Sequence, residues 1–269
     1  MRQPNDILSL CEAHYDFMSA WPDFVREDWV GATFIGNRLL PIPFRNHVAL
    51  VRSQPEDADA LIERASTFYR ALAAPPAFQL DPATTPPDLP ARLVRAGYSK
   101  QVEEIWMVCA LEEAPSALAP AGVTIEQLTP ASPASLIQAY IDCYNISFRA
   151  PAHVHDGFGA SFRAVLPHPE GLHFVGLLEG RPAGAVSLFH KAGLGGVYNV
   201  GTLPAFRGHG VATALLRHLL DVARQLGLTQ LILQTVHHGP AQPIYERTGF
   251  RPRFVRDWYL PVAPGGIWS

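Results

Sequence analysis

The chain has 269 residues, and its 48% of hydrophobic residues can fill the core of one large domain or of two ordinary ones. Its formal net charge is −3 and its pI is near 6.4, so we expect no nucleic-acid partner. The three cysteines show neither metal-ligand spacing nor a disulfide framework, and the opening MRQPNDILSL lacks the apolar core of a signal peptide. No apolar run has the length of a membrane span. These features predict a cytoplasmic protein with no membrane partner.

In chain order, the first predicted elements are a helical N-terminal segment, a strand at 46–53 and a helix over 56–72. A proline-rich run then precedes a short helix that ends at Gly97. Residues 101–111 alternate between apolar and polar types, as a half-buried strand does. After them, the Pro- and Ala-rich segment 115–121 predicts a linker between two units of ordinary domain size.

The second part of the chain predicts hairpins first and strand–helix alternation later. This order is typical of an α/β fold with a mixed sheet. The predicted elements are a strand at 122–128, helices at 134–148 and 157–166, strands at 173–180 and 184–193 joined by a turn at Arg181-Pro182, a strand ending at Leu203, a helix from Val211, a strand at 229–236, a short helix at 241–249 and a last strand around 254–260.

The loop in TLPAFRGHGVAT, residues 202–213, has the composition of an anion-binding site. Pro204 ends strand pairing because it has no N–H, and Gly208 and Gly210 allow positive φ and close approach of a ligand. The N-terminus of the following helix presents unpaired N–H groups and the positive end of the helix dipole. Arg207 adds a multidentate phosphate donor. The loop therefore predicts a site for a diphosphate or polyphosphate.

Two common nucleotide motifs do not fit this loop. A Walker A loop needs a Lys-Ser/Thr pair after its last glycine, where Val211 and Ala212 stand. A Rossmann fingerprint needs a third glycine at position 213, where Thr213 stands. Both readings are therefore excluded.

The spacing Arg207-x-x-Gly210-x-Ala212 resembles the pyrophosphate-binding loop of the GNAT superfamily of acyl-CoA N-acyltransferases. The resemblance extends over 122–260, because the strand VYNVGTLP, the long helix, the strand TQLILQTV and the segment AQPIYERTGF follow the family's order. It implies an α/β fold with a mixed, mostly antiparallel central sheet flanked by helices. It also implies that 122–269 is the catalytic domain.

The resemblance implies direct transfer of an acetyl group from acetyl-CoA to a primary amine of a small molecule or amino acid derivative. In such proteins the strand before the loop splays from its neighbour, and its backbone pairs with the pantetheine arm and stabilises the oxyanion. The implied cofactor-binding residues are Val200, Gly201, Thr202, Arg207, Gly208, His209, Gly210, Val211, Ala212, Thr213 and His238.

The same resemblance implies Tyr245 as the general acid that protonates the leaving thiolate. The general base stays open, since the strand before the loop has no carboxylate where many family members have a glutamate. The candidates are a water chain, Tyr198, or a histidine such as His190 or His155. His238 departs from the family pattern, which often has an asparagine at this position.

Clustered histidines occur at 237–238 and 153–156, but they lack nearby cysteines and a helix-borne H-E-x-x-H pattern. We therefore expect no metal. Residues 146–171 form a loop-rich span that we expect on the acceptor side of the site. Its Arg, His and aromatic residues do not select one acceptor class.

The end of the first unit, 90–111, repeats the pattern of 241–262: a short helix, a Gly-aromatic pair and a strand that ends in aromatic residues. Residues 1–114 thus resemble a second, degenerate GNAT lobe, so the chain would have two similar lobes in tandem. The segment before its long helix is acidic, so we expect it not to bind CoA. The lobe either supports the acceptor cleft or contributes to substrate binding through three tryptophans, namely Trp21, Trp29 and Trp106.

Two other functions fit the same residues. One is an acetyl-CoA sensor without turnover, since the strand before the loop carries no carboxylate base. The other is a protein acetyltransferase that modifies a lysine or an N-terminus. Either a monomer or a homodimer is compatible with the sequence.

Overall fold

The computed structural model describes residues 6–115 and 122–262, and the chain divides into two compact units. Unit 1 comprises Met1–Trp106 and Phe254–Ser269, and unit 2 comprises Met107–Arg253. The divisions fall inside two long strands, β5 (Tyr98–Ala110) and β11 (Arg251–Pro261), so each strand contributes residues to both units. The linker predicted at 115–121 lies outside the described residues except for Pro115. The assignment of functional lobes at 1–114 and 122–269 remains a prediction.

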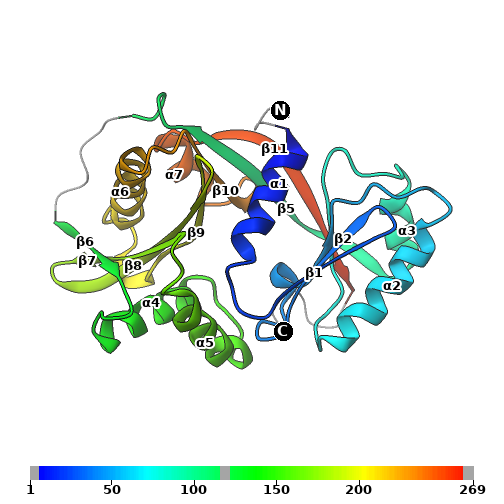
Figure 1. Cartoon of the computed structure of the whole chain (residues 1–269), viewed down its shortest axis with the longest axis horizontal. Helices are drawn as coiled ribbons and strands as arrows, with labels where there is room; N and C mark the ends of the chain where they lie inside the picture. The colour runs from blue at the N-terminus through cyan, green and yellow to red at the C-terminus, as the bar shows by residue number, and fades with distance from the viewer. Residues whose placement is uncertain (1–5, 116–121, 263–269) are drawn as a thin grey trace. The chain divides into compact units, whose positions relative to one another are not determined.

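Unit 1 is a sheet with the strand order β1-β2-β3-β4-β11-β5, accompanied by three helices (Figure 1). Helix α2 follows the expected amphipathic pattern, because its buried residues Ala58, Leu61, Ala65 and Tyr69 share one side. The elements before β5 are α1 (Ile7–Met18), β1 (Phe24–Trp29), β2 (Ala32–Asn37), a 3-10 turn (Pro43–Arg45), β3 (His47–Ala49), α2 (Ala58–Ala71), β4 (Phe78–Leu80) and α3 (Leu89–Arg95).

The β1–β2 hairpin was not predicted from the sequence. Its two-residue turn, Val30-Gly31, has positive φ at both positions, 41° and 73°. Such turns match the twist of a hairpin and usually carry Asn-Gly or Asp-Gly, whereas a β-branched residue rarely adopts positive φ. The turn signal that normally reveals a hairpin is therefore missing.

Unit 2 is a sheet with the strand order β10-β9-β8-β7-β6, antiparallel except for the β9–β10 pair. Its elements are β6 (Val123–Leu128), α4 (Ala134–Ser147), a 3-10 turn (Ala152–Val154), α5 (His155–Val165), β7 (Gly171–Leu178), β8 (Arg181–Lys191), β9 (Leu194–Thr202), a 3-10 turn (Pro204–Phe206), α6 (Val211–Gln225), β10 (Gln230–Val236) and α7 (Gln242–Arg247). The turn expected at Arg181-Pro182 lies earlier, at Glu179-Gly180, because these two residues adopt positive φ and Arg181 already pairs with Leu178.

Helices cover both faces of the unit 2 sheet, with α4 and α5 on one face and α6 and α7 on the other (Figure 1). Strand β8 is consequently buried without interruption from Ala183 to Phe189. The close approach of α6 is visible at Gly184, where an added Cβ would lie 2.7 Å from Val211 Cγ1. The mixed, mostly antiparallel α/β fold expected from the sequence is confirmed.

The two units share one order of elements. In unit 2 the order β7-β8-β9-α6-β10-α7-β11 has two antiparallel pairs followed by the parallel pair β9–β10. The order β1-β2-β3-α2-β4-α3-β5 has the same pairing, with β3 and β4 parallel. The two lobes are thus similar in topology. No helix among the described residues has the length and apolar character needed to cross a membrane.

The three tryptophans named above belong to unit 1. Trp21 and Trp106 are buried, and Trp29 packs edge-on against Phe34. Trp106 also stacks on Phe254 with 5.2 Å between ring centroids. These contacts are those of core residues.

Candidate active site

The strands β9 and β10 separate after a short parallel ladder. Their register joins only Leu194–Gly196 to Gln230–Ile232, and the later residues of β9 have no partner in β10. Strand β9 also carries a bulge, because its register with β8 passes from Ser187↔Tyr198 to Ala185↔Gly201. Asn199 and Val200 therefore lie outside the ladders with both neighbouring strands.

The loop after β9 leads into α6 with the backbone geometry of an anion site. Gly208 and Gly210 adopt φ of 82° and 79°, where a side chain would be strained. Gly210 is the N-cap residue of α6 and provides no side-chain cap, and the first intrahelical bond runs from Ala214 N to Gly210 O. The N–H groups of the first helical residues, 211–213, are then available to a negatively charged ligand.

The side chain of Arg207 lies in the same loop and is exposed. Its Nε donates to Thr202 O at 3.2 Å, which ties the guanidinium to the end of β9. The backbone carbonyl oxygen of Arg207 is 3.0 Å from His209 Nδ1. Among the described residues the two Nη groups of Arg207 have no partner, so they can reach a phosphate.

The end of β9 lies very close to α4, and buried polar side-chain atoms near this end have no hydrogen-bond partner among the described residues. At Gly201 an added Cβ would lie 3.0 Å from Ser147 Oγ and 3.2 Å from Cys143 Sγ, so α4 leaves no space for a side chain. Thr202 Oγ1 on β9 and Gln234 Nε2 on β10 are buried, and neither finds a hydrogen-bond partner among the described residues. Such orphaned groups suit a ligand that carries amides.

Tyr245 lies in α7 and is 7% exposed. Its ring packs edge-on against Phe250, with 6.1 Å between centroids. Burial raises the pKa of its phenol above the ordinary value. Its hydroxyl makes no hydrogen bond to any described residue, so Tyr245 keeps its proton and can donate it.

His238 follows β10 and is exposed. Its backbone adopts φ of 56°, and its N–H donates to Gln242 Oε1 at 2.8 Å. Its ring stacks on His237 at 3.8 Å between centroids. The geometry places His238 in the β10–α7 connection, at the end of β10 that has separated from β9.

The three residues considered as the base lie in different places. Tyr198 immediately precedes the bulge and is half-buried, and its ring packs edge-on against Phe189. His190 is paired with Gly195 near the β8–β9 turn. With a strand rise of about 3.3 Å per residue, Gly195 lies roughly 16 Å along β9 from the bulge. His155 begins α5, and its Nε2 is 2.8 Å from Ala150 O. The structure therefore brings Tyr198, and not His190, to the bulge.

Sequence reasoning missed a buried polar chain behind the bulge. Asn199 Nδ2 donates to Tyr140 Oη at 3.0 Å, Tyr140 Oη is hydrogen-bonded to Ser187 Oγ, and Ser187 Oγ is 2.7 Å from His173 Nδ1. These four residues come from α4 and three strands. No fixed spacing joins them in sequence, so only their positions in the fold reveal the chain.

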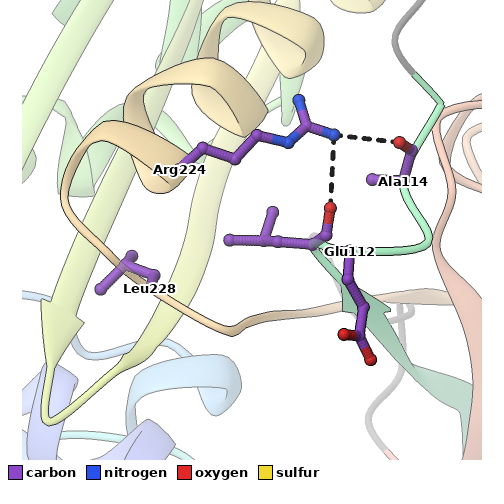
Figure 2. A pocket seen from close by; sticks show the side chains of 5 residues that line it. Glu112, Ala114, Arg224 and Leu228 are labelled. Atoms are coloured by element: carbon purple, nitrogen blue, oxygen red, sulfur yellow. Dashed lines mark hydrogen bonds between the residues drawn. The ribbon is translucent and has the colours of Figure 1, made fainter.

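A surface depression of about 370 Å³ lies at the opposite end of α6 (Figure 2). It is lined by Leu111, Glu112, Ala114, Arg224 and Leu228. Figure 2 shows the Arg224 guanidinium turned toward backbone carbonyls, and its Nη2 donates to Leu111 O and Ala114 O at 3.4 and 3.0 Å. The Arg224 guanidinium is thus hydrogen-bonded to two carbonyl oxygens of the protein. With a helical rise of about 1.5 Å per residue, Arg224 lies roughly 20 Å along α6 from the start of the helix. The depression is distinct from the loop site.

The described residues contain no cluster of metal ligands, and the start of α2 differs in charge from the start of α6. No group of three or more His, Cys, Asp or Glu side chains within 6–115 and 122–262 could hold a metal ion. In unit 1 the corresponding helix α2 has Asp57 as its N-cap residue and Asp59 in its first turn. Two carboxylates at this helix end repel a phosphate.

The model of the Acetyltransferase (GNAT) family matches residues 134–250. No curated protein matches the chain. A solved GCN5-related N-acetyltransferase from Kribbella flavida is 18% identical with a TM-score of 0.71, and the alignment covers 96% of this chain and 95% of that one. Another, from Sphaerobacter thermophilus, is 17% identical with a TM-score of 0.65 and coverages of 89% and 84%.

A tandem GNAT protein from the clavulanic acid biosynthesis pathway is 15% identical with a TM-score of 0.61, and the alignment covers 93% of this chain and 88% of that one. At these identities the likeness concerns the fold, and it extends over both units. The family model covers α4 to the end of α7, which includes the bulge, the loop and Tyr245. The chain thus has the GNAT fold, and its residues 134–250 match the model of the GNAT acetyltransferase family.

Proposed function

We propose that the chain is an N-acetyltransferase that transfers the acetyl group of acetyl-CoA to a primary amine of a small molecule or amino acid derivative. One observation carries the proposal. The bulge of β9, the part of β9 that has no register partner in β10, and the N-terminus of α6 follow one another within the family-matched residues. Together they offer consecutive sites for a thioester, an amide-containing arm and a diphosphate.

The donor site is supported by chemically matched groups. The N–H groups at 211–213 and the Arg207 guanidinium would bind the pyrophosphate. The orphaned Thr202 Oγ1 and Gln234 Nε2 would hydrogen-bond the amides of the pantetheine arm. The backbone N–H of Val200, which lies outside the β8 and β10 ladders, would stabilise the charge that develops on the thioester oxygen.

The chemical step needs two proton movements. The attacking amine forms the new C–N bond as the C–S bond breaks, and Tyr245 donates its proton to the departing sulfur. The proton lost by the amine would pass to a deprotonated Tyr198, to His155 or to a chain of water molecules; the position of Tyr198 in β9, two residues before Val200, supports the first. Orientation of the two substrates by the site supplies much of the remaining rate enhancement.

One alternative is favoured by a specific observation. Strand β9, from Leu194 to Thr202, carries no carboxylate, so the conventional base is missing from this strand. A protein of this kind could bind acetyl-CoA as a sensor and not turn it over.

A thiol-release assay over a panel of primary amines, combined with thermal unfolding in the presence of acetyl-CoA, tests the proposal. We expect acetyl-CoA to raise the unfolding temperature and at least one amine to cause release of CoA thiol with formation of an equal amount of acetylated amine. Stabilisation without thiol release from any amine would overturn the enzyme proposal and favour the sensor.

A further inference from the structure

The bulge of β9 is connected to the interior of unit 2 by the hydrogen-bonded chain Asn199–Tyr140–Ser187–His173, which we call the bulge chain. Tyr140, Ser187 and His173 are fully buried. They lie on the sheet face that α4 and α5 cover, and the Tyr140 ring stacks on Phe162 with 3.9 Å between centroids. Four polar residues in an apolar layer are costly unless they are hydrogen-bonded, so the bulge chain has a definite geometry.

The inventory of donors fixes the direction of the first hydrogen bond in the bulge chain. Asn199 Nδ2 can only donate, so the oxygen of Tyr140 accepts this bond. Ser187 Oγ is hydrogen-bonded to both Tyr140 Oη and His173 Nδ1, so it links these two residues. Burial lowers the pKa of His173 to about 4, so its imidazole is neutral near pH 7.

The first member of the bulge chain stands at the strained point of β9. Asn199 adopts φ of 56°, a left-handed conformation that asparagine tolerates better than most residues but that still costs free energy. Asn199 and its neighbour Val200 have no register partner in β8 or β10. The hydrogen bond from the Asn199 side chain to Tyr140 ties this pair of residues to α4.

We propose that Asn199 and Tyr140 are positioning residues for acetyl transfer. The bulge chain holds Asn199 in its left-handed conformation and thereby fixes the backbone at Val200, whose N–H would meet the thioester oxygen. This inference rests on the proposed function, because it assigns the residues that set the geometry of its oxyanion contact. It extends that function to α4 and β8, which carry no residue of the donor site itself.

A structural role for Tyr140 can be separated from a positioning role by a matched control in the same helix. Tyr144 lies one turn further along α4 and stacks on Phe158 with 3.6 Å between centroids. Its hydroxyl makes no hydrogen bond to any described residue. Tyr140→Phe and Tyr144→Phe therefore each remove one hydroxyl from a stacked ring, but only Tyr140→Phe breaks the bulge chain.

In the first experiment, we expect Tyr140→Phe to lower kcat about 10-fold with KM for acetyl-CoA changed less than about two-fold, because the lost contact acts on the oxyanion. Tyr144→Phe should leave both constants unchanged. Equal effects of the two variants on kcat would overturn the positioning role.

In the second experiment, Asn199→Gly and Asn199→Ala separate the conformation of the bulge from contacts of the side chain. Glycine adopts positive φ without strain, whereas alanine does not. We therefore expect Asn199→Gly to retain several-fold more kcat than Asn199→Ala. Both variants lose the hydrogen bond to Tyr140, so a difference between them reports the left-handed conformation, and equal losses would contradict the role proposed for that conformation.

A readout without turnover keeps this inference distinct from the proposed function. Hydrogen–deuterium exchange of the peptide 197–203 should be faster in Tyr140→Phe than in Tyr144→Phe, whether or not any amine is acetylated. Unchanged exchange would overturn the anchoring role even in an active enzyme. Absent turnover with accelerated exchange would instead overturn the proposed function and support the anchor.

Discussion

At the scale of single residues, the proton balance of the proposed reaction depends on Tyr245. Burial raises the pKa of its phenol, so the group remains protonated at neutral and moderately alkaline pH. We predict that Tyr245→Phe lowers kcat about 100-fold and changes acetyl-CoA affinity little, because the ring keeps its contact with Phe250. Steady-state kinetics and calorimetry measure the two quantities. Lower affinity with unchanged kcat would identify Tyr245 as a packing residue instead.

Arg207 provides the charge of the proposed pyrophosphate site. Its Nε is already bonded to Thr202 O, which holds the guanidinium beside the loop at the start of α6. We predict that Arg207→Glu weakens acetyl-CoA binding by about 10- to 100-fold, since a charge-assisted phosphate contact becomes a repulsion. Arg95→Glu is the control, because Arg95 is an exposed arginine of α3 in unit 1. Equal affinities of the two variants in calorimetry would contradict the loop assignment.

At the scale of elements, α6 has a left-handed glycine near each end. Gly208 precedes the helix with φ of 82° and Gly227 follows it with φ of 69°, and an added Cβ would meet nothing within 4 Å at either position. Alanine at each should therefore lower the free energy of unfolding by a similar amount, about 1 kcal/mol. We predict that only Gly208→Ala weakens acetyl-CoA binding, since only it distorts the anion loop. Chemical denaturation and calorimetry test the pair, and equal weakening by Gly227→Ala would count against the loop site.

The elements that sequence patterns could predict are those with local signals. The long helix from Val211 has a regular apolar stripe and glycines at both ends, so its bounds and its anion loop follow from spacing. The Val30-Gly31 hairpin has no such signal because its turn contains a β-branched residue. Asn199 has no local signal, since nothing in the neighbouring residues marks it. Its role depends on Tyr140 and Ser187, which are distant in sequence and come together only when the sheet forms.

At the scale of the whole molecule, the chain's last strand completes the first unit. Strand β11 pairs with β4, and it brings Arg256 into a buried cluster where its guanidinium lies 3.7 Å from Glu104 Oε1 and 4.3 Å from the centroid of the Trp106 ring. Glu104 also accepts hydrogen bonds from the Gln79 amide and the Trp258 indole. Unit 1 therefore includes residues of β11, which lie far along the chain from its other strands.

The buried cluster predicts unequal effects of two arginine substitutions in unit 1. Arg256 is fully buried, and Arg256→Met would leave the Glu104 carboxylate without its cation, lowering the free energy of unfolding by about 3 kcal/mol. Arg92→Met removes only surface ion pairs with Asp88 and Asp59, which water screens, so its effect on the free energy of unfolding should be much smaller. Urea unfolding measures both. Similar small losses would show that the buried cluster contributes little to unit 1.

In the proposed reaction, the bulge of β9 and the start of α6 together form the acetyl-CoA site. A crystal structure of the full chain with acetyl-CoA tests this claim most directly. We predict the diphosphate within hydrogen-bond distance of the N–H groups at 211–213 and of Arg207, and the thioester oxygen within hydrogen-bond distance of Val200 N. Acetyl-CoA bound elsewhere on the chain, with these N–H groups left without the ligand, would contradict it.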